Sequence, residues 1–227
     1  MSKRSNPLRI RIATFNIRHG LGLDGRVDLE RTAASVLATG ADLIALQELD
    51  VGLARSGEVD QPAEIARLTG LEMHFRATLH LEPGAYGIAV AARLPLEAGF
   101  EPLPRAGSEE PRGAIVVRLE GLTVIATHLS TDRRARRRQV RALAALATAR
   151  PGPVVVTGDL NSSRWGLGPL ARAGFRGERL GPTVVKNPFP RQIDHVLGGP
   201  GVAVSGTRAL PGGASDHVPV AATVEMP

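Results

Sequence analysis

Short apolar runs that end in polar residues recur along the chain. Residues 8–17 (LRIRIATFNI) alternate apolar and polar side chains and then become continuously apolar, a pattern typical of a strand that enters a buried sheet. Residues 41–48 (ADLIALQE) form a second such run, and residues 153–163 (PVVVTGDLNSS) form a third that is rich in β-branched valine. We therefore predict buried strands that bring polar side chains to their carboxyl ends.

Helical patterns separate these strands. The first predicted helix lies between an N-cap at Asp28 and a stop at Gly40, and the second between an N-cap at Asp60 and a stop at Gly70. Residues 132–149 form a third helix with apolar positions on one side and an arginine-rich face that we expect to be merely solvated. A short fourth helix is predicted over residues 166–173, followed by a loop.

More strands are expected in the middle and at the end of the chain. Glu120-Gly121 is a tight-turn signal and predicts a hairpin between two of them. The other predicted strands cover residues 73–81, 86–93, 96–103, 113–119, 122–129, 192–197 and 201–209, and a last strand follows Ser215-Asp216-His217. The apolar runs alone would allow a doubly wound parallel sheet, but the hairpin and the adjacent strands before it favour antiparallel pairing.

Length and composition indicate one soluble globular unit. No Ser/Gly-rich or charged linker interrupts the 227 residues, so we predict a single domain over residues 1–227, with residues 1–7 flexible. No segment has the length of a signal peptide or of a membrane span, and we expect a cytoplasmic protein and a monomer. No cysteine occurs, which excludes disulfides, thiolate metal sites and cysteine nucleophiles.

The net charge of +6 comes almost wholly from arginine, since Lys3 and Lys186 are the only lysines. Arginine suits bidentate contacts with phosphate, so a polyanionic partner fits this composition. A GC-rich genome that favours arginine codons explains it equally well. Charge alone therefore leaves both explanations open.

Polar residues that could carry chemistry lie at the ends of the apolar runs. Each has an ordinary structural explanation as a turn residue or a satisfied buried histidine. Together they are hard to explain in that way, because one end of a sheet would gather them into a single pocket. They are Asn16, Glu48, His128, Asp159 with Asn161, Asp194, and Asp216 with His217.

The Gly-Asp-Leu-Asn stretch is open to two interpretations. If extended pairing continued through it, the side chains of Asp159 and Asn161 would leave the same face, one as a base and the other as a donor. Alternatively, the stretch is an Asx-turn that closes a strand. His195 follows Asp194 and should point to the opposite face of its strand.

These motifs resemble those of the endonuclease/exonuclease/phosphatase superfamily, the DNase-like phosphoesterases. They occur in the family's order and span nearly the whole chain. The motifs are Thr14-Phe15-Asn16-Ile17, Leu46-Gln47-Glu48, Thr127-His128-Leu129, Gly158-Asp159-Leu160-Asn161, Ile193-Asp194-His195 and Ser215-Asp216-His217. The resemblance implies an α/β (α+β) fold, a four-layer sandwich of two packed, mostly antiparallel β-sheets flanked by helices.

The resemblance also implies roles for these residues. The metal ligands would be Glu48, Asn16 and Asp216, an oxygen-rich set for one or two Mg²⁺ or Mn²⁺ ions. The catalytic set would have Asp159 deprotonating the attacking water, Asn161 fixing that water or the phosphate, His217 kept cationic by Asp194, and His128 stabilising phosphate or protonating the leaving group.

Other assignments are secondary. Tyr86 would assist His128, and Arg112 and Arg55 would contact substrate phosphate. The histidines at positions 19, 74 and 80 lack a motif and are taken as structural. The single tryptophan, Trp165, does not supply the set of aromatic wedges that would kink or read DNA.

The sequence thus predicts a metal-dependent hydrolase that cleaves phosphodiester bonds by direct water attack. The arginine excess favours nucleic acid, DNA or RNA, as the phosphate-containing substrate. One alternative is a phosphatase or phosphodiesterase that acts on a small phosphorylated metabolite or a lipid headgroup. A second is a non-catalytic module that binds phosphate.

Overall fold

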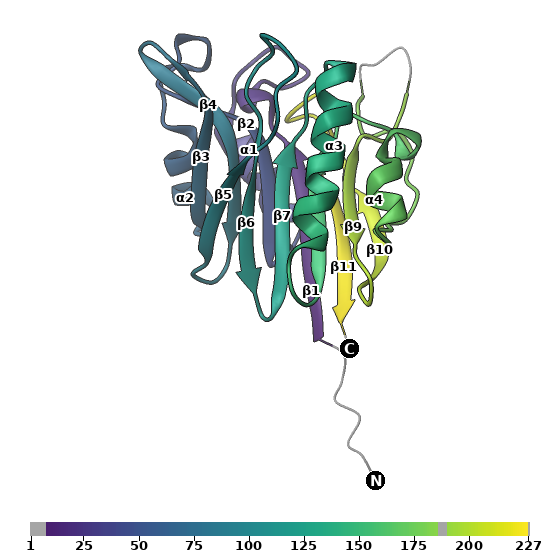
Figure 1. The fold of residues 1–227 in the computed structure, drawn as a ribbon. Coiled ribbons are helices and arrows are strands. Elements are labelled where there is room, and N and C mark those ends of the chain that lie inside the picture. Colours follow the sequence, from purple (N-terminus) through teal and green to yellow (C-terminus); the bar gives the residue numbers. More distant parts are fainter. Residues whose placement is uncertain (1–7, 186–189, 227) are drawn as a thin grey trace.

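Two β-sheets face each other in the centre of the molecule (Figure 1). The structure, a computed structural model, describes residues 8–185 and 190–226, and the segment 1–7 that the sequence predicts to be flexible lies outside them. In the described part of the chain, no helix is long and apolar enough to cross a membrane.

The first sheet has the strand order β10-β11-β1-β2-β4-β3. Its strands are β1 (Leu8–Asn16), β2 (Leu43–Val51), β3 (Glu72–Leu81), β4 (Gly84–Ala92), β10 (Ala203–Ala209) and β11 (Val220–Met226). β1 and β2 run parallel and are joined through α1 (Leu29–Ala38), while β11, β4 and their outer neighbours pair antiparallel. The carboxyl ends of β1 and β2 therefore lie at one end of the sheet.

The second sheet has the strand order β5-β6-β7-β8-β9. Its strands are β5 (Glu97–Pro102), β6 (Gly113–Leu119), β7 (Leu122–His128), β8 (Val154–Asp159) and β9 (Asp194–Gly198). β7 and β8 run parallel and are joined through α3 (Arg133–Thr148), so this sheet repeats the arrangement of the first. The hairpin predicted at Glu120-Gly121 is present, with positive φ at both residues as a tight turn of this type requires.

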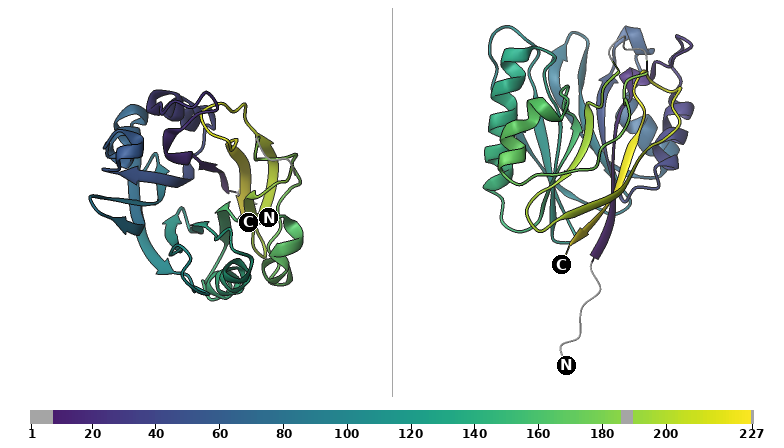
Figure 2. Two further views of the ribbon diagram at one scale, coloured as in Figure 1. Left: turned by 90° about the horizontal axis from the view of Figure 1, so that it is seen from above. Right: turned by 90° about the vertical axis from the view of Figure 1, so that its right-hand side faces the viewer.

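Helices cover the outer face of each sheet (Figure 2). α1 and α2 (Gln61–Thr69) pack on the first sheet, and α3 and α4 (Gly168–Arg172) pack on the second. Short 3₁₀ segments complete the regular structure: η1 (Arg18–Gly20), η2 (Ala54–Ser56) and η3 (Arg164–Leu167). The predicted four-layer sandwich of two mostly antiparallel sheets is confirmed, and the doubly wound parallel sheet is not formed.

Alternating burial explains why the central strands are apolar on both faces. In β1, Ile10 and Ile12 enter the core between the sheets, whereas Phe15 packs under α1 and α2. In β8, Val155 enters the same central core and Val156 packs under α3 and α4. Each such side chain stabilises the fold by about 1.5–3 kcal/mol when it is fully buried. The strands that carry the site are thus the most firmly held ones.

Two predicted strand starts are corrected by the structure. The last strand, β11, follows Ser215-Asp216-His217 and begins at Val220, and the Ser215 hydroxyl accepts the His217 N–H in the turn before it. The strand predicted from Gln192 begins at Asp194, because the Asp194 and Ile193 amides donate to Thr183 Oγ1 instead of to a neighbouring strand. The strand predicted from Gly201 begins at Ala203.

Candidate active site

The candidate residues come together where the two parallel strand pairs end, at the upper end of the molecule in Figure 1. Asn16 ends β1 and its amide nitrogen donates to Glu48 Oε1 at 2.8 Å and to Asp159 Oδ2 at 3.1 Å. Its amide oxygen accepts the Arg18 N–H at 3.0 Å, which fixes the orientation of the carboxamide. One amide nitrogen therefore bridges a carboxylate from each sheet.

Glu48 lies in β2 at a break in its pairing with β4 and has a left-handed φ of 63°. A non-glycine residue in this region is uncommon, and strain of this kind concentrates at functional sites. The bulge turns the half-buried Glu48 side chain toward Asn16. Local backbone geometry thus supports a carboxylate that stays accessible.

Asp159 is the buried centre of the site. Its Oδ1 accepts the Asn161 N–H at 2.9 Å, and Asn161 has a φ of 47°, so the stretch forms the Asx-turn and extended pairing stops at Asp159. The turn still brings the Asn161 side chain back to the Leu129 carbonyl at 2.9 Å. A Cβ at Gly158 would collide with the Thr127 carbonyl oxygen, so glycine is needed before Asp159.

The electrostatics of Asp159 favour proton uptake. Burial and, next, the negative charge of Asp194 raise its pKa to about 7, while His217 and hydrogen bonds from Asn161 and Asn16 act in the opposite direction. A carboxyl group that changes protonation near neutral pH is suited to act as a general base.

His217 and Asp194 form a buried pair on the other side of Asp159. The Nδ1–H of His217 donates to Asp194 Oδ2 at 2.9 Å, and Thr183 Oγ1 donates to the same oxygen at 2.6 Å. Burial lowers the pKa of His217, but Asp194 outweighs it with help from other carboxylates, and the pKa rises to about 10. His217 is therefore an imidazolium whose Nε2 lies 3.8 Å from Asp159 Oδ2.

His128 differs from His217 in charge. Its Nδ1 lies 2.7 Å from Arg112 Nη1, and since arginine can only donate, Nδ1 is the unprotonated acceptor. Burial, Arg112 and His217 together hold the pKa of His128 well below its usual range. His128 is thus a neutral ring whose Nε2 lies 3.2 Å from Asn161 Nδ2 and 3.5 Å from Asp159 Oδ2.

The expected metal ligands contact other protein groups. Glu48 and Asn16 are in contact, but Asp216 Oδ2 lies 3.6 Å from Arg18 Nε, and Asn16 uses its oxygen on a backbone amide. Among the described residues, the only three acidic or histidine groups that could share an ion are Asp159, Asp194 and His217. Because His217 is protonated and paired there, we favour the Glu48 side of Asp159 as the place for a cation.

The expected substrate residues are held mostly by protein partners. Arg55 makes a two-point ion pair with buried Asp50, at 2.8 and 2.7 Å, and lies 5.4 Å over the Tyr86 ring. Arg112 contacts Glu110 at 3.1 Å in addition to His128. Burial and the charges of Glu48 and Glu110 raise the pKa of Tyr86, while Arg112 acts in the opposite direction.

Two neighbours of the site were missed from the sequence. His19, taken as structural, lies close enough to Glu48, Asp50 and Arg55 for their charges to act on its pKa, which burial lowers, and its Nδ1 is buried without a partner. Asp50 was not considered at all. Their nearness in sequence to Asn16 and Glu48 was the available signal. His195, as expected, points away and contacts the Ser162 carbonyl at 2.9 Å.

A model of the endonuclease/exonuclease/phosphatase family matches residues 13–217, which contain every group described above. The chain belongs to this family. No curated protein matches the chain in sequence. Members of the endonuclease/exonuclease/phosphatase family are hydrolases that act on phosphoester bonds.

Solved structures of the family share the fold. An endonuclease/exonuclease/phosphatase from Beutenbergia cavernae DSM 12333 matches with a TM-score of 0.79 at 23% identity, over 96% of this chain and 72% of its own. A mannosyl-6-phosphatase from Bacteroides thetaiotaomicron VPI-5482 gives 0.72 at 15%, over 95% and 99%. The human Nocturnin catalytic domain with bound sulfate gives 0.70 at 17%, over 95% and 94%. Within the endonuclease/exonuclease/phosphatase family, this likeness establishes the fold and leaves the substrate open.

Proposed function

We propose that this protein hydrolyses phosphodiester bonds by direct attack of water, with Asp159 as the general base. The observation that carries the proposal is the placement of Asp159. Its carboxylate is buried, has a pKa raised to about 7, and lies between the amide nitrogen of Asn16 and the imidazoles of His128 and His217. Such a group can take a proton from water at neutral pH while charged and neutral donors surround it.

The residues fit a divalent cation on the Glu48 side. The Asn16 amide donates to both Glu48 and Asp159. One neutral donor compensates little of the repulsion between two neighbouring carboxylates. Oxygen donors of this kind suit Mg²⁺ or Mn²⁺. When bound, the cation would neutralise phosphoryl oxygens and stabilise the leaving oxygen. We assign its binding to Glu48 and keep Asn16 and Asp216 as predicted contributors.

The chain's own residues supply the remaining steps. Asp159 removes a proton from the attacking water, and Asn161, fixed by the Leu129 carbonyl, orients that water. The His217 imidazolium, held by Asp194, donates its Nε2–H to a non-bridging phosphoryl oxygen and stabilises the charge that develops there. His128 adds a neutral donor beside it.

Nucleic acid remains our preferred substrate class, because phosphodiesters with many charges suit an arginine-rich surface. The mannosyl-6-phosphatase among the structural neighbours keeps a small phosphorylated metabolite as the second candidate. In this proposal, both substrates would use the same Asp159 and His217 chemistry.

The test is hydrolysis of a chromogenic bis-nitrophenyl phosphate with Mg²⁺ or Mn²⁺. We expect Asp159→Asn to lose at least about a hundredfold in rate, the scale of a general base, and EDTA to abolish turnover. Asp42→Asn is the matched control, because Asp42 lies at the other end of the first sheet, where it accepts the Arg11 N–H. Equal activity in EDTA or in Asp159→Asn would rule the mechanism out.

A further inference from the structure

An arginine-lined hollow of about 430 Å³ lies between α3 and α4, beside the candidate active site. Arginine side chains from both helices line it, together with the single tryptophan of the chain. These residues are Arg133, Arg136, Arg137, Arg141, Arg172 and Trp165. Neither the hydrolytic mechanism nor the packing of the core uses this set.

The arginines of α3 keep their charge uncompensated. Arg133, Arg137 and Arg141 are four residues apart, so they occupy one face of the helix on successive turns. Like charges at this spacing destabilise a helix by a few tenths of a kcal/mol per pair. In the described part of the chain, neither these three nor Arg172 has an ion pair with a carboxylate.

The arginines of the two helices on the first sheet are neutralised. Arg31 of α1 binds Asp24 at 2.8 Å, and Arg67 of α2 binds Glu64 at 2.6 Å. Among the α-helices of the described residues, the arginines without an ion pair to a carboxylate therefore lie on α3 and α4. A genome-wide preference for arginine codons would not produce this asymmetry.

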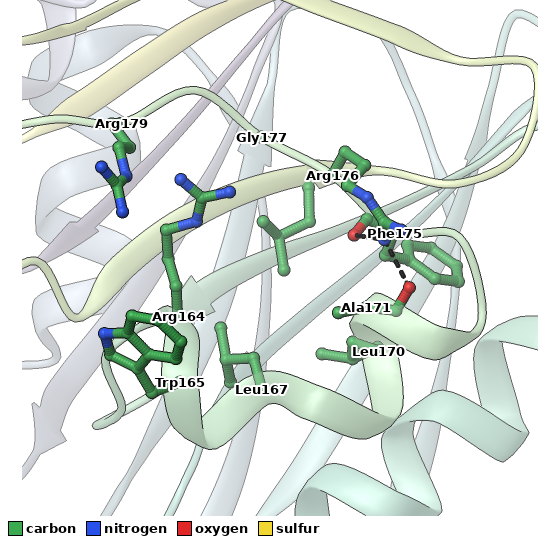
Figure 3. Close-up of a pocket in the computed structure, with 10 residues that line it drawn as sticks. Arg164, Trp165, Leu167, Leu170, Ala171, Phe175, Arg176, Gly177 and Arg179 are labelled. Atoms are coloured by element: carbon green, nitrogen blue, oxygen red, sulfur yellow. Dashed lines mark hydrogen bonds between the residues drawn. The ribbon is translucent and has the colours of Figure 1, made fainter.

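Trp165 stands at the edge of the hollow with 90% of its surface exposed. It follows the Asx-turn of the site by four residues and also borders a second hollow of about 330 Å³ (Figure 3). There its indole lies beside Arg164 and Leu167. A flat aromatic face next to several guanidinium groups is the arrangement that stacks a base while phosphates are neutralised.

Two segments link the hollow to the catalytic centre. Ser162, which follows Asn161 directly, lines its wall. Arg136 donates to the Ser130 and Thr131 carbonyls at 2.9 and 2.6 Å, on the loop that follows His128. A chain that occupies the hollow would thus lead toward Asp159.

We propose that this hollow binds a single-stranded nucleic acid, with backbone phosphates on the α3 arginines and an unpaired base stacked on Trp165. The inference rests on the proposed phosphodiesterase function and adds the surface that holds the strand outside the reaction centre. Arg133 to Arg141 spans eight residues, about 12 Å of helix, which corresponds to about three or four nucleotides. Base stacking requires unpaired bases, which is why the strand is single.

An anionic membrane is the competing polyanion, and the surface fits it less well. Membrane surfaces are bound by several apolar side chains that enter the lipid together with basic ones. Among the large apolar side chains that are exposed in the described residues, only Trp165 borders this hollow. A lone indole within a ring of arginines matches a base flanked by phosphates.

The test uses Trp165 as its own reporter, since no other tryptophan contributes fluorescence. The Asp159→Asn protein, which should not hydrolyse the oligonucleotide, is titrated with a 12-nucleotide oligothymidylate in Mg²⁺ buffer. We expect quenching of Trp165 and an affinity that falls with salt, with a log–log slope of about −2 for three phosphate contacts. A labelled oligonucleotide followed by anisotropy gives the same affinity without tryptophan.

Variants separate charge from stacking. The triple change Arg133→Gln, Arg137→Gln and Arg141→Gln should weaken binding at least about tenfold and remove most of the salt slope. Trp165→Ala should weaken it about five- to a hundredfold, and Trp165→Phe less. The matched control replaces three exposed arginines that lie outside the hollow with glutamine: Arg93, Arg118 and Arg208.

Each outcome decides one question. An equal loss of binding in the control triple, or no quenching by the oligonucleotide, would contradict the proposed binding surface. Hydrolysis of the chromogenic diester by the wild type would still support the proposed function in that case. A response to phosphatidylserine vesicles in place of the oligonucleotide would assign the surface to membranes and also overturn the inference. Oligonucleotide binding without any metal-dependent hydrolysis by the wild-type protein would keep the surface and reject the function.

Discussion

The two parallel strand pairs are built alike but present different chemistry. In the first sheet, β1 and β2 flank α1 and end near Asn16 and Glu48. In the second, β7 and β8 flank α3 and end at His128 and Asp159. Glu48 is half-buried on a strained bulge, whereas Asp159 is fully buried with a pKa near 7. In the function proposed above, the first pair would hold the cation and the second would move the proton.

The helices that connect the strands within each pair differ in how their arginines are paired. Arg31 of α1 forms an ion pair with Asp24, while α3 presents a row of arginines to solvent without carboxylate partners. The second half of the molecule therefore carries both Asp159, the proposed general base, and the row of arginines on α3. From this comparison we infer that the substrate chain approaches over the second sheet and that the first sheet completes the site from the other side.

The sharpest way to break this comparison is a metal titration of Glu48→Gln against Asp159→Asn. Glu48→Gln should raise the metal concentration for half-maximal rate at least about tenfold, because a charged oxygen ligand is lost, and excess metal should restore much of the rate. Asp159→Asn should stay at least about a hundredfold slow at any metal concentration, because the base itself is missing. If excess metal rescued Asp159→Asn and not Glu48→Gln, the two roles would have to be exchanged.

The pH profile of Asp194→Asn tests the second half alone. In the wild type, activity should rise as Asp159 ionises with a pKa of about 7 and fall as His217 deprotonates with a pKa of about 10. The negative charge of Asp194 raises both pKa values, so its removal should move both limbs to lower pH, and activity at pH 9 should fall about tenfold or more. A bound cation would lower the pKa of Asp159, and so shift the acid limb to lower pH, in both proteins.

The measurement is kcat/KM from pH 5 to 10.5 for the two proteins. A purely structural defect would lower the amplitude and leave the limbs in place, which would contradict the assignment. The linked stability change has a definite sign. The pKa of His217 is raised, so its contribution to stability is complete below about pH 6.5 and is lost as pH rises through about 10. The stability difference between wild type and Asp194→Asn should shrink over that range.

The sequence predicted the strands better than their arrangement. Apolar runs placed β1, β2 and β8 correctly, because a strand buried on both faces must be apolar throughout. The same property hides which neighbour each strand pairs with, and the runs alone allowed a parallel sheet. The start of β9 was placed two residues too early, because the Ile193 amide donates to the side chain of Thr183, which lies ten residues earlier in the chain.

For the site, motif residues were predictable and their partners were not. Asp159, Asp194 and His217 lie in recognisable stretches, and the structure brings them within 4.8 Å of one another. The contact between Arg112 and His128 joins residues 16 apart through the register of β6 and β7, which no local pattern encodes. The lowered pKa of His128 depends on its burial and on that contact, and no local sequence pattern encodes either of them.

Arg112→Met tests how the second half keeps His128 neutral. Removal of the donor on Nδ1 and of a nearby cation should raise the pKa of His128 and allow the other tautomer, at a cost in rate of about tenfold, the value of one such hydrogen bond. Nitrogen chemical shifts of the His128 ring report the tautomer directly. Arg55→Met is the control, because Arg55 binds Asp50 and should leave these shifts unchanged. Unaltered His128 shifts in Arg112→Met would contradict the assignment.

The smallest expected difference is in the caps of the two connecting helices. Asp28 caps α1 through one backbone amide, that of Arg31, whereas Asp132 caps α3 through two, those of Arg134 and Ala135. Replacement of either by alanine should destabilise the protein by about 1 kcal/mol, or about 2–4 °C in melting temperature.

The Asp132→Ala change should cost more than Asp28→Ala, since it also removes a carboxylate from beside the α3 arginines. Asp132→Asn keeps an acceptor oxygen and loses only the charge, so it isolates that electrostatic part, which should shrink in high salt. Thermal unfolding of the three variants measures these differences, and hydrolysis of the chromogenic diester should stay within about twofold because neither cap touches the reacting groups. Equal melting temperatures for Asp132→Asn and wild type at low salt would show that repulsion among the α3 arginines does not lower the stability of the folded protein.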